Sequence, residues 1–251
     1  MTSWSKRRRL IYAGIVIFLL IAVVGIPSFL FFYKAPTCFD GRRNGNEQDV
    51  DCGGSCSRLC PSAFLSPAVS WTRFEEVAPH IYNVAAYVVN PNSKVRAEGT
   101  PYLVTLYDAQ AVPIAEVTGT FTIPAGRNTL AFKASVNTGI QTPARASMKF
   151  TGVPAWAYDT KPTTGLSVTD QNYIEGSTTS SLIVTLANKG AQNLSGITVY
   201  VILQDKDKNA VGFSKTIVDS IPSQGSAIAP FTWPQGHNGK VVSIEVLPVA
   251  E

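Results

Sequence analysis

The chain has 251 residues, of which 45% are hydrophobic and 15% are charged, and its formal net charge is +4. This composition is that of a folded protein rather than a disordered chain, and the length permits one large domain or two small ones. Lys6, Arg7, Arg8, Arg9 and Lys34 are five of the 21 basic residues, which leaves 16 basic against 17 acidic residues beyond Lys34. Because that remainder is nearly neutral, the sequence argues against nucleic-acid binding.

Residues 10–33 form an uncharged, apolar segment of 24 residues. At about 1.5 Å per residue it is longer than the hydrocarbon core of about 30 Å, so it predicts a membrane-spanning helix. The positive-inside rule places residues 1–9 in the cytoplasm and the chain after Lys34 outside the cell. The alternative is a cleaved signal peptide, whose apolar part is usually only ~7–15 residues long. Pro27 is expected to bend the helix near residues 23–26.

All four cysteines fall within a short segment that follows the helix. They are spaced as Cys38-x13-Cys52-x3-Cys56-x3-Cys60. Outside the cell two disulfides are the expected use, because so short a segment cannot bury enough apolar surface to fold alone, and three pairings are open. The alternatives are zinc held by four thiolates, whose usual ligand spacing differs, and an iron–sulfur cluster, which needs a reducing compartment.

Between the first two cysteines lies a loop rich in oxygen-bearing side chains and glycines. Such a loop can wrap a hard cation, but Arg42 stands where an EF-hand needs a carboxylate, so the pattern is not an EF-hand. The alternative is a tight loop held by disulfides, because Asp, Asn and Gly also favour turns. No cofactor is expected other than calcium, for which the candidate ligands are Asp40, Asn44, Asn46, Glu47, Asp49 and Asp51.

This cysteine segment resembles a known extracellular motif. Residues 38–56 match the pattern Cys-x-Asp-Gly-x-x-Asn-Gly-x-Glu-x-x-Val-Asp-Cys-Gly-Gly-x-Cys, which recurs in secreted and surface-anchored proteins, often beside β-rich modules. The resemblance covers residues 38–60 and implies an extracellular setting more than any activity.

The rest of the chain predicts two tandem β-sandwiches. Residues 62–153 and 166–251 align with a shift of about 97 or 98 residues, and short β-branched and aromatic segments alternate with Asn, Gly and Pro turns in both. Asn90 corresponds to Asn188, and the strand that ends in Asp108 corresponds to the strand that ends in Asp205. The fold class expected is mainly β, with two immunoglobulin-like sandwiches, one N-terminal transmembrane helix and a small disulfide-rich knob.

The Leu106-Tyr107-Asp108 triplet, with the Asn90 turn before it and an Ile-Pro-x-Gly turn after it, resembles the bacterial FxLYD-type domain. The second copy has Gln204 in place of the tyrosine and is a looser match. This resemblance implies an immunoglobulin-like or fibronectin-like architecture in the cell envelope of a bacterium, without a defined ligand.

The sequence offers few candidates for chemistry. The two histidines, His80 and His237, occupy non-equivalent places, and none of the usual catalytic motifs is present, so the chain is not expected to be an enzyme. Exposed aromatic residues in the connection between the sandwiches can stack on glycans, and the candidates there are Trp156 and Tyr158, although tryptophan is more often buried.

The sequence therefore predicts a single-pass, membrane-anchored extracellular structural or interaction protein with a protein or cell-surface partner. The alternatives are a calcium- or glycan-binding surface module and an accessory subunit of a larger membrane assembly. The expected organisation is a basic cytoplasmic head (1–9), a transmembrane helix (10–33), a cysteine-rich knob (34–61), a first sandwich (62–153), a linker (154–165) and a second sandwich (166–251).

Overall fold

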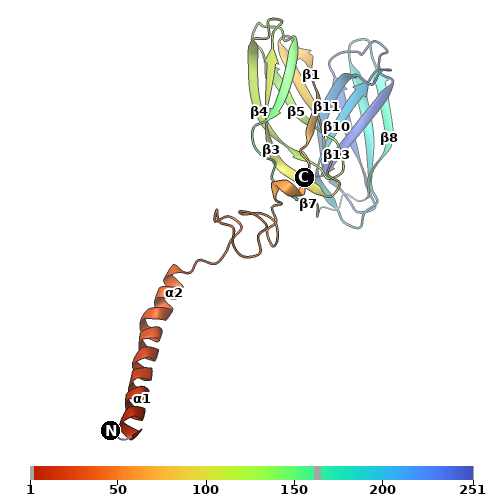
Figure 1. The fold of residues 1–251 in the computed structure, drawn as a ribbon. Helices are drawn as coiled ribbons and strands as arrows, with labels where there is room; N and C mark the ends of the chain where they lie inside the picture. The colour runs from red at the N-terminus through yellow and green to blue at the C-terminus, as the bar shows by residue number, and fades with distance from the viewer. Residues whose placement is uncertain (1–2, 161–164, 251) are drawn as a thin grey trace. The chain divides into compact units, whose positions relative to one another are not determined.

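The computed structural model describes residues 3–160 and 165–250. Residues 1–2 of the predicted head, 161–164 of the predicted linker and residue 251 lie outside the described residues. The protein is mainly β, and the chain divides into two units, Met1–Ser55 and Cys56–Glu251. The first contains the helix and most of the knob, and the second contains two β-sandwiches (Figure 1).

The N-terminal helix is long and apolar, and its large apolar side chains that the structure describes are exposed. It comprises α1 (Ser3–Leu20), a π-helical turn (Ile21–Gly25) and α2 (Ile26–Phe32). The π-turn lies just before Pro27, which cannot donate a backbone hydrogen bond. The bend expected near residues 23–26 stays a prediction. Residues 6–29 are long and apolar enough to cross a membrane, which is compatible with an anchor or a signal sequence.

The cysteine knob has little regular structure. Its elements are an isolated bridge between Asp49 and Cys52 and a short 3-10 turn at Pro61–Ala63. All four cysteines are disulfide-bonded, which confirms two disulfides in a small knob. Since no thiolate is left, the alternatives of zinc and an iron–sulfur cluster are wrong.

The first sandwich contains two antiparallel sheets. One has the strand order β1-β2-β5, and the other has the order β4-β3-β6, with the short strand β7 paired to the beginning of β3. Its strands are β1 (Ala68–Ala78), β2 (Ile81–Val89), β3 (Val95–Tyr107), β4 (Pro113–Ile123), β5 (Thr129–Asn137), β6 (Arg145–Phe150) and β7 (Trp156–Tyr158).

The second sandwich has the same strand order as the first. Its sheets are β8-β9-β12 and β11-β10-β13. Its strands are β8 (Leu166–Glu175), β9 (Ser180–Asn188), β10 (Leu194–Gln204), β11 (Ala210–Ile221), β12 (Ser226–Trp233) and β13 (Ser243–Ala250).

Each sandwich has its own apolar core between its two sheets. In the first, Val84 on β2 faces Val104 and Leu106 on β3, and in the second Val184 on β9 and Val201 on β10 occupy the core; all five are fully buried. Alternate residues of each strand face this core, as the two-residue period of a β-strand requires.

A third apolar cluster joins the two sandwiches face to face. Ala85 and Leu130 on the outer face of sheet β1-β2-β5 pack against Ile202 and Phe213 on the outer face of sheet β11-β10-β13. The part of sheet β11-β10-β13 around Ile202 and Phe213 is therefore buried on both sides, and the strands of the two sandwiches lie side by side (Figure 1). The result is four layers of sheet, with β4-β3-β6 and β12-β9-β8 outermost.

Polar contacts reinforce the same interface. The Tyr87 hydroxyl donates to Glu245 at 2.8 Å, and burial, together with this carboxylate, raises the pKa of Tyr87 to about 12. The Arg96 guanidinium donates to the carbonyl oxygen of Ala250 at 3.0 Å, which links β3 to the end of β13. The two sandwiches are thus held together by apolar packing and by buried polar pairs.

The aligned asparagines tie two loops together in each sandwich. The Asn188 side chain donates to the carbonyl oxygens of Gln192, Ile221 and Pro222, and it is 2% exposed. The Asn90 side chain donates to the carbonyl oxygen of Pro124 at 2.7 Å. The two amides thus donate hydrogen bonds to backbone carbonyl oxygens in the loops, and these bonds hold the turns at the end of each sandwich.

Candidate functional site

The predicted calcium loop is held by its own carboxylates. Asp51 accepts hydrogen bonds from the backbone N–H groups of Asp40 and Gly41 at 3.0–3.1 Å. Asp40 in turn accepts from the Arg42 N–H at 3.0 Å and from the Asn44 amide at 2.8 Å. The Asn44 hydrogen bond holds the pKa of Asp40 below its ordinary value, as expected for a carboxylate that accepts several hydrogen bonds.

The remaining predicted ligands follow the same pattern. Glu47 accepts from the N–H groups of Asn44 and Asp51, and Asp49 accepts from the N–H of Val50. Asn46 is exposed. These oxygens act as turn caps, which is the alternative role that the composition of the loop allows. Calcium binding stays a prediction, and an ion there would have to compete with these backbone N–H groups.

The two predicted glycan-stacking residues have different environments. Trp156 is 1% exposed and lies in the core of the first sandwich, where its ring packs against Phe64 with 5.1 Å between ring centroids. The prediction for Trp156 is therefore wrong, because a buried ring offers no face to a ligand. Tyr158 is 63% exposed. The segment predicted as a linker also needs correction here, since its residues 156–158 form β7 and belong to the first sandwich.

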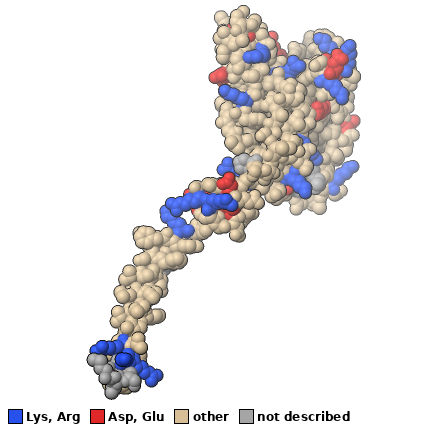
Figure 2. Space-filling model, in the orientation of Figure 1, with Lys and Arg blue, Asp and Glu red and all other residues tan. Residues whose placement is uncertain are grey.

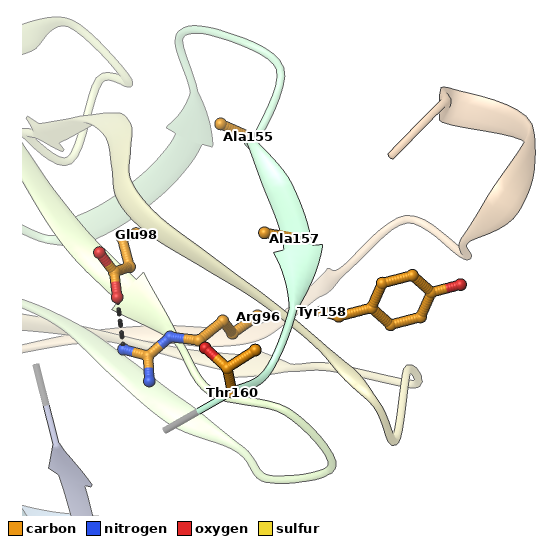
Figure 3. A pocket seen from close by; sticks show the side chains of 6 residues that line it. All are labelled: Arg96, Glu98, Ala155, Ala157, Tyr158 and Thr160. Carbon is orange, nitrogen blue, oxygen red and sulfur yellow. Dashed lines mark ion pairs between the residues drawn. The ribbon is translucent and has the colours of Figure 1, made fainter. Parts of the chain in front are cut away.

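A hollow of about 250 Å³ lies beside β7, lined by Arg96, Glu98, Ala155, Ala157, Tyr158 and Thr160 (Figure 3). Arg96 is 5% exposed and pairs with Glu98 at 3.0 Å and with Asp159 at 3.6 Å. Figure 3 shows the Tyr158 ring pointing away from the Arg96–Glu98 ion pair. The hollow thus does not combine an aromatic platform with polar groups on one surface, and Arg96 serves to join the sandwiches.

A second polar cluster lies buried between the sandwiches around Glu75. Glu75 belongs to β1 of the first sandwich, yet its carboxylate accepts from the Gln235 side chain at 3.0 Å and from the Phe213 N–H at 3.4 Å in the second. The nearest Glu75 oxygen is 3.9 Å from Nε2 of His237, and both side chains are at most 6% exposed. Burial raises the pKa of Glu75 and lowers the pKa of His237.

Both ring nitrogens of His237 lie near polar groups. Its Nδ1 lies 2.9 Å from the Tyr173 hydroxyl and 3.3 Å from the Ser180 hydroxyl, and Ser180 donates its own proton to the carbonyl oxygen of Gln235. Nδ1 thus lies within hydrogen-bonding distance of two hydroxyl groups, while Nε2 faces Glu75. At 3.9 Å the two groups are too far apart for a hydrogen bond.

Sequence reasoning missed the Glu75 cluster. It gave His237 no role and did not single out Glu75. One sequence signal was present, a glycine inside a strand. Gly212 lies in β11, and a Cβ at this position would approach His237 Nε2 to 2.5 Å. A glycine inside a strand is a known mark of close approach by another group.

The outermost sheets differ in the character of their surface. On β12-β9-β8, the isoleucines Ile174, Ile183 and Ile228 are 43–62% exposed. They share the outer face, because the register pairs Ile174 with Ser181 and Ile228 with Thr185, which lie on the same face of β9 as Ile183. On β4-β3-β6, the outer face carries Glu116, and Arg145 stacks over the ring of Tyr107. The first of these two faces is the more apolar.

Comparison with known proteins gives no family. No protein-family model matches the sequence, and no curated protein matches it. Solved structures with similarity include a β-glucuronidase from glycoside hydrolase family 2 (12% identity, TM-score 0.20) and a putative β-galactosidase from Bacteroides fragilis (13% identity, TM-score 0.20). The matches cover 87% and 69% of this chain but 29% and 33% of those chains. At such TM-scores they support no argument about function.

Proposed function

We propose that this chain is a single-pass, membrane-anchored protein that holds two docked β-sandwiches outside the cell as an interaction module, without catalysis. The observation that carries the proposal is the apolar helix. Residues 6–29 could span a bilayer, and none of the most apolar part of this segment is buried against the rest of the protein. A helix of this kind needs another apolar environment, and a bilayer supplies it.

The orientation is supported by charge and by redox chemistry. Four basic residues precede the apolar segment, which favours a cytoplasmic N-terminus. The four cysteines that follow it are disulfide-bonded, and disulfides persist in oxidising spaces outside the cytosol.

The interaction role is supported by the way the sandwiches dock. Their shared interface uses one sheet of each sandwich, which leaves the other two sheets and the strand-connecting loops at the surface. The exposed isoleucines of β12-β9-β8 add apolar surface of the kind that protein partners cover.

Intact mass and protease accessibility test the anchor. We expect protein extracted from source-cell membranes to retain residues 1–33, and we expect external protease to degrade the sandwiches while an N-terminal tag inside the cell survives. A mature chain that begins after the apolar segment would identify a signal peptide and overturn the anchor. Turnover of a substrate by the purified chain would overturn the non-catalytic role.

A further inference from the structure

The three exposed isoleucines of sheet β12-β9-β8 form a diagonal stripe across its outer face. Ile183 lies on the central strand, β9. Ile174 on β8 pairs with the residue two positions before Ile183, and Ile228 on β12 pairs with the residue two positions after it. Diagonal neighbours on adjacent strands are only about 7–8 Å apart, so the three side chains form one apolar patch with Ile183 at its centre. Pro230, which pairs with Ile183 and is exposed, extends the patch.

The centre of this stripe corresponds to a residue through which the first sandwich docks. Asn90 and Asn188 are aligned at the ends of β2 and β9, and Ala85 and Ile183 each lie five residues before the asparagine of their own sandwich. Ala85 is fully buried in the cluster that joins the two sandwiches, whereas Ile183 is exposed. Equivalent positions thus have a partner in the first sandwich and none in the second among the described residues.

The strand register extends this correspondence to both neighbouring strands. Leu130 and Ile228 each pair with the residue three positions before the aligned asparagine of their own sandwich. Glu75 and Ile174 each pair with the residue seven positions before it. Leu130 and Glu75 both contact the second sandwich, whereas Ile228 and Ile174 are exposed. The outer face of β12-β9-β8 is therefore the second copy of a face that docks on a sheet, and it carries isoleucine at each of these positions.

Charge decides which sheet this face fits. Within β8, β9 and β12, Asp170 is the only charged residue that the register places on the outer face. The other free sheet, β4-β3-β6, carries Glu116, Arg145 and Lys149 on its outer face. Covering those charges with isoleucine would take them out of water without pairing them, which is costly. The isoleucine face thus fits the same face of a second copy better than it fits β4-β3-β6.

The size of the face predicts a weak contact that the membrane reinforces. Its strands have 8–10 residues. At about 3.3 Å per residue and about 4.8 Å between strands, the sheet covers roughly 400 Å² in projection, which is small beside the ~800 Å² that each partner contributes to a standard interface. Copies anchored in one membrane meet more often than free copies, and Figure 2 shows the long uncharged helix that would confine them.

We propose that two copies of this chain associate through the outer faces of sheet β12-β9-β8, about a two-fold axis that passes Ile183. This inference rests on the proposed anchor and interaction role, and it names a second copy as the partner. Because Ile183 lies at the centre of the stripe, an axis that runs either along or across the stripe brings Ile183 against its own copy. The contact gives the second sandwich a sheet-on-sheet partner, as docking already does for the first.

Energy transfer between full chains in liposomes measures this association. One preparation carries a donor dye on its N-terminal amine and another carries an acceptor, and stepwise dilution with lipid gives the association constant. We expect the wild type to show more transfer than randomly distributed chains. Ile183→Asp and Ile183→Lys should each lower the association constant at least about tenfold, because like charges then meet at the axis. Ile217→Asp, at a position on β11 that is 58% exposed, is the matched control and should leave the association unchanged.

A mixture of the two charged variants tests the symmetry. Donor-labelled Ile183→Asp and acceptor-labelled Ile183→Lys should together restore most of the transfer, because opposite charges meet when Ile183 faces its own copy. Contact of this face with a different face of the second copy would leave the mixture as weak as either variant alone. Urea denaturation curves that match the wild type confirm that each variant is folded.

Each remaining outcome overturns the proposal. Wild-type transfer at the random level assigns the isoleucine face to a different protein. Transfer that Ile183→Asp leaves unchanged assigns association to another part of the chain, and an equal loss with Ile217→Asp shows that the effect is not specific to this face. A mixture that stays weak overturns the two-fold arrangement. All of these outcomes leave the membrane anchor and the non-catalytic role standing, since the intact-mass, protease and turnover measurements test those separately.

Discussion

Docking of the two sandwiches predicts unequal effects for two isoleucines on outer sheet faces of the second sandwich. Ile202 on β10 is 1% exposed because the first sandwich covers it, whereas Ile228 on β12 is 62% exposed. Truncation of a buried isoleucine to alanine costs about 2–5 kcal/mol, while most surface substitutions stay within about 0.5 kcal/mol. We therefore expect Ile202→Ala to lower the free energy of unfolding by about 2–5 kcal/mol and Ile228→Ala to change it little.

Urea denaturation of the full chain in mild detergent, followed by tryptophan fluorescence, measures both variants. Hydrogen exchange supplies a second readout, since loss of docking should increase exchange in β2 and β5 of the first sandwich, which contain no substitution. Equal small effects of the two substitutions, with unchanged exchange in β2 and β5, would show that the sandwiches behave as independent modules and would refute the docked arrangement.

Three further predictions concern buried polar groups. Burial raises the pKa of Glu75 above its ordinary 4.5. The stability that this carboxyl contributes is therefore complete below pH 4.5 and is lost as the pH rises through the raised pKa. Glu75→Gln should reduce the fall in unfolding free energy between about pH 5 and 8, and an unchanged fall would contradict this. Burial lowers the pKa of His237 below 6.5, so the stability that the neutral imidazole contributes is present above pH 6.5 and is lost as the pH falls through the lowered pKa. His237→Gln should flatten the acid side of the plot of unfolding free energy against pH. A plot like that of the wild type would count against a lowered pKa for His237. Asn188→Ala removes an amide NH2 group whose two hydrogens are shared among three backbone carbonyl oxygens, and it should cost about 2–4 kcal/mol in urea denaturation. An effect below about 1 kcal/mol would mean that water replaces the amide.

The acidic loop shows why residue composition alone left two roles open. Asp, Asn and Glu side chains at these spacings can bind calcium, and the same side chains can cap turns. Sequence alone could not separate the two, because the difference lies in which oxygen atoms meet backbone N–H groups. The hydrogen bonds of Asp40 and Asp51 show the capping role.

Trp156 shows a similar limit. Its position between two sandwiches suggested an exposed ring, but the segment pairs with β3, and register then places Trp156 beside Ala97 on the core side. Three residues are too few to reveal a strand by periodicity, so only the pairing identifies β7. Tyr158, two residues further on, extends past the core and is exposed.

Elements with local signals could be predicted from the sequence. The length and apolarity of residues 10–33, the clustered cysteines and the strand-and-turn pattern each follow from neighbouring residues, and the fold class followed from them. A further local signal was available, because an unbroken apolar strand is typical of a sheet that is buried on both sides. Residues 199–203 of β10 are continuously apolar, whereas residues 102–106 of β3 include Thr105 on the outer face.

The way the sandwiches meet could not be predicted from the sequence, because it depends on residues far apart in the chain. Glu75 and Gln235 are 160 residues apart in the chain, and Arg96 and Ala250 are 154 apart. No periodicity within a strand specifies which outer face finds which partner, because that choice depends on the shape and polarity of two assembled surfaces. The burial of Glu75, and with it the pH dependence expected of the interface, exists only once both sandwiches have folded and docked.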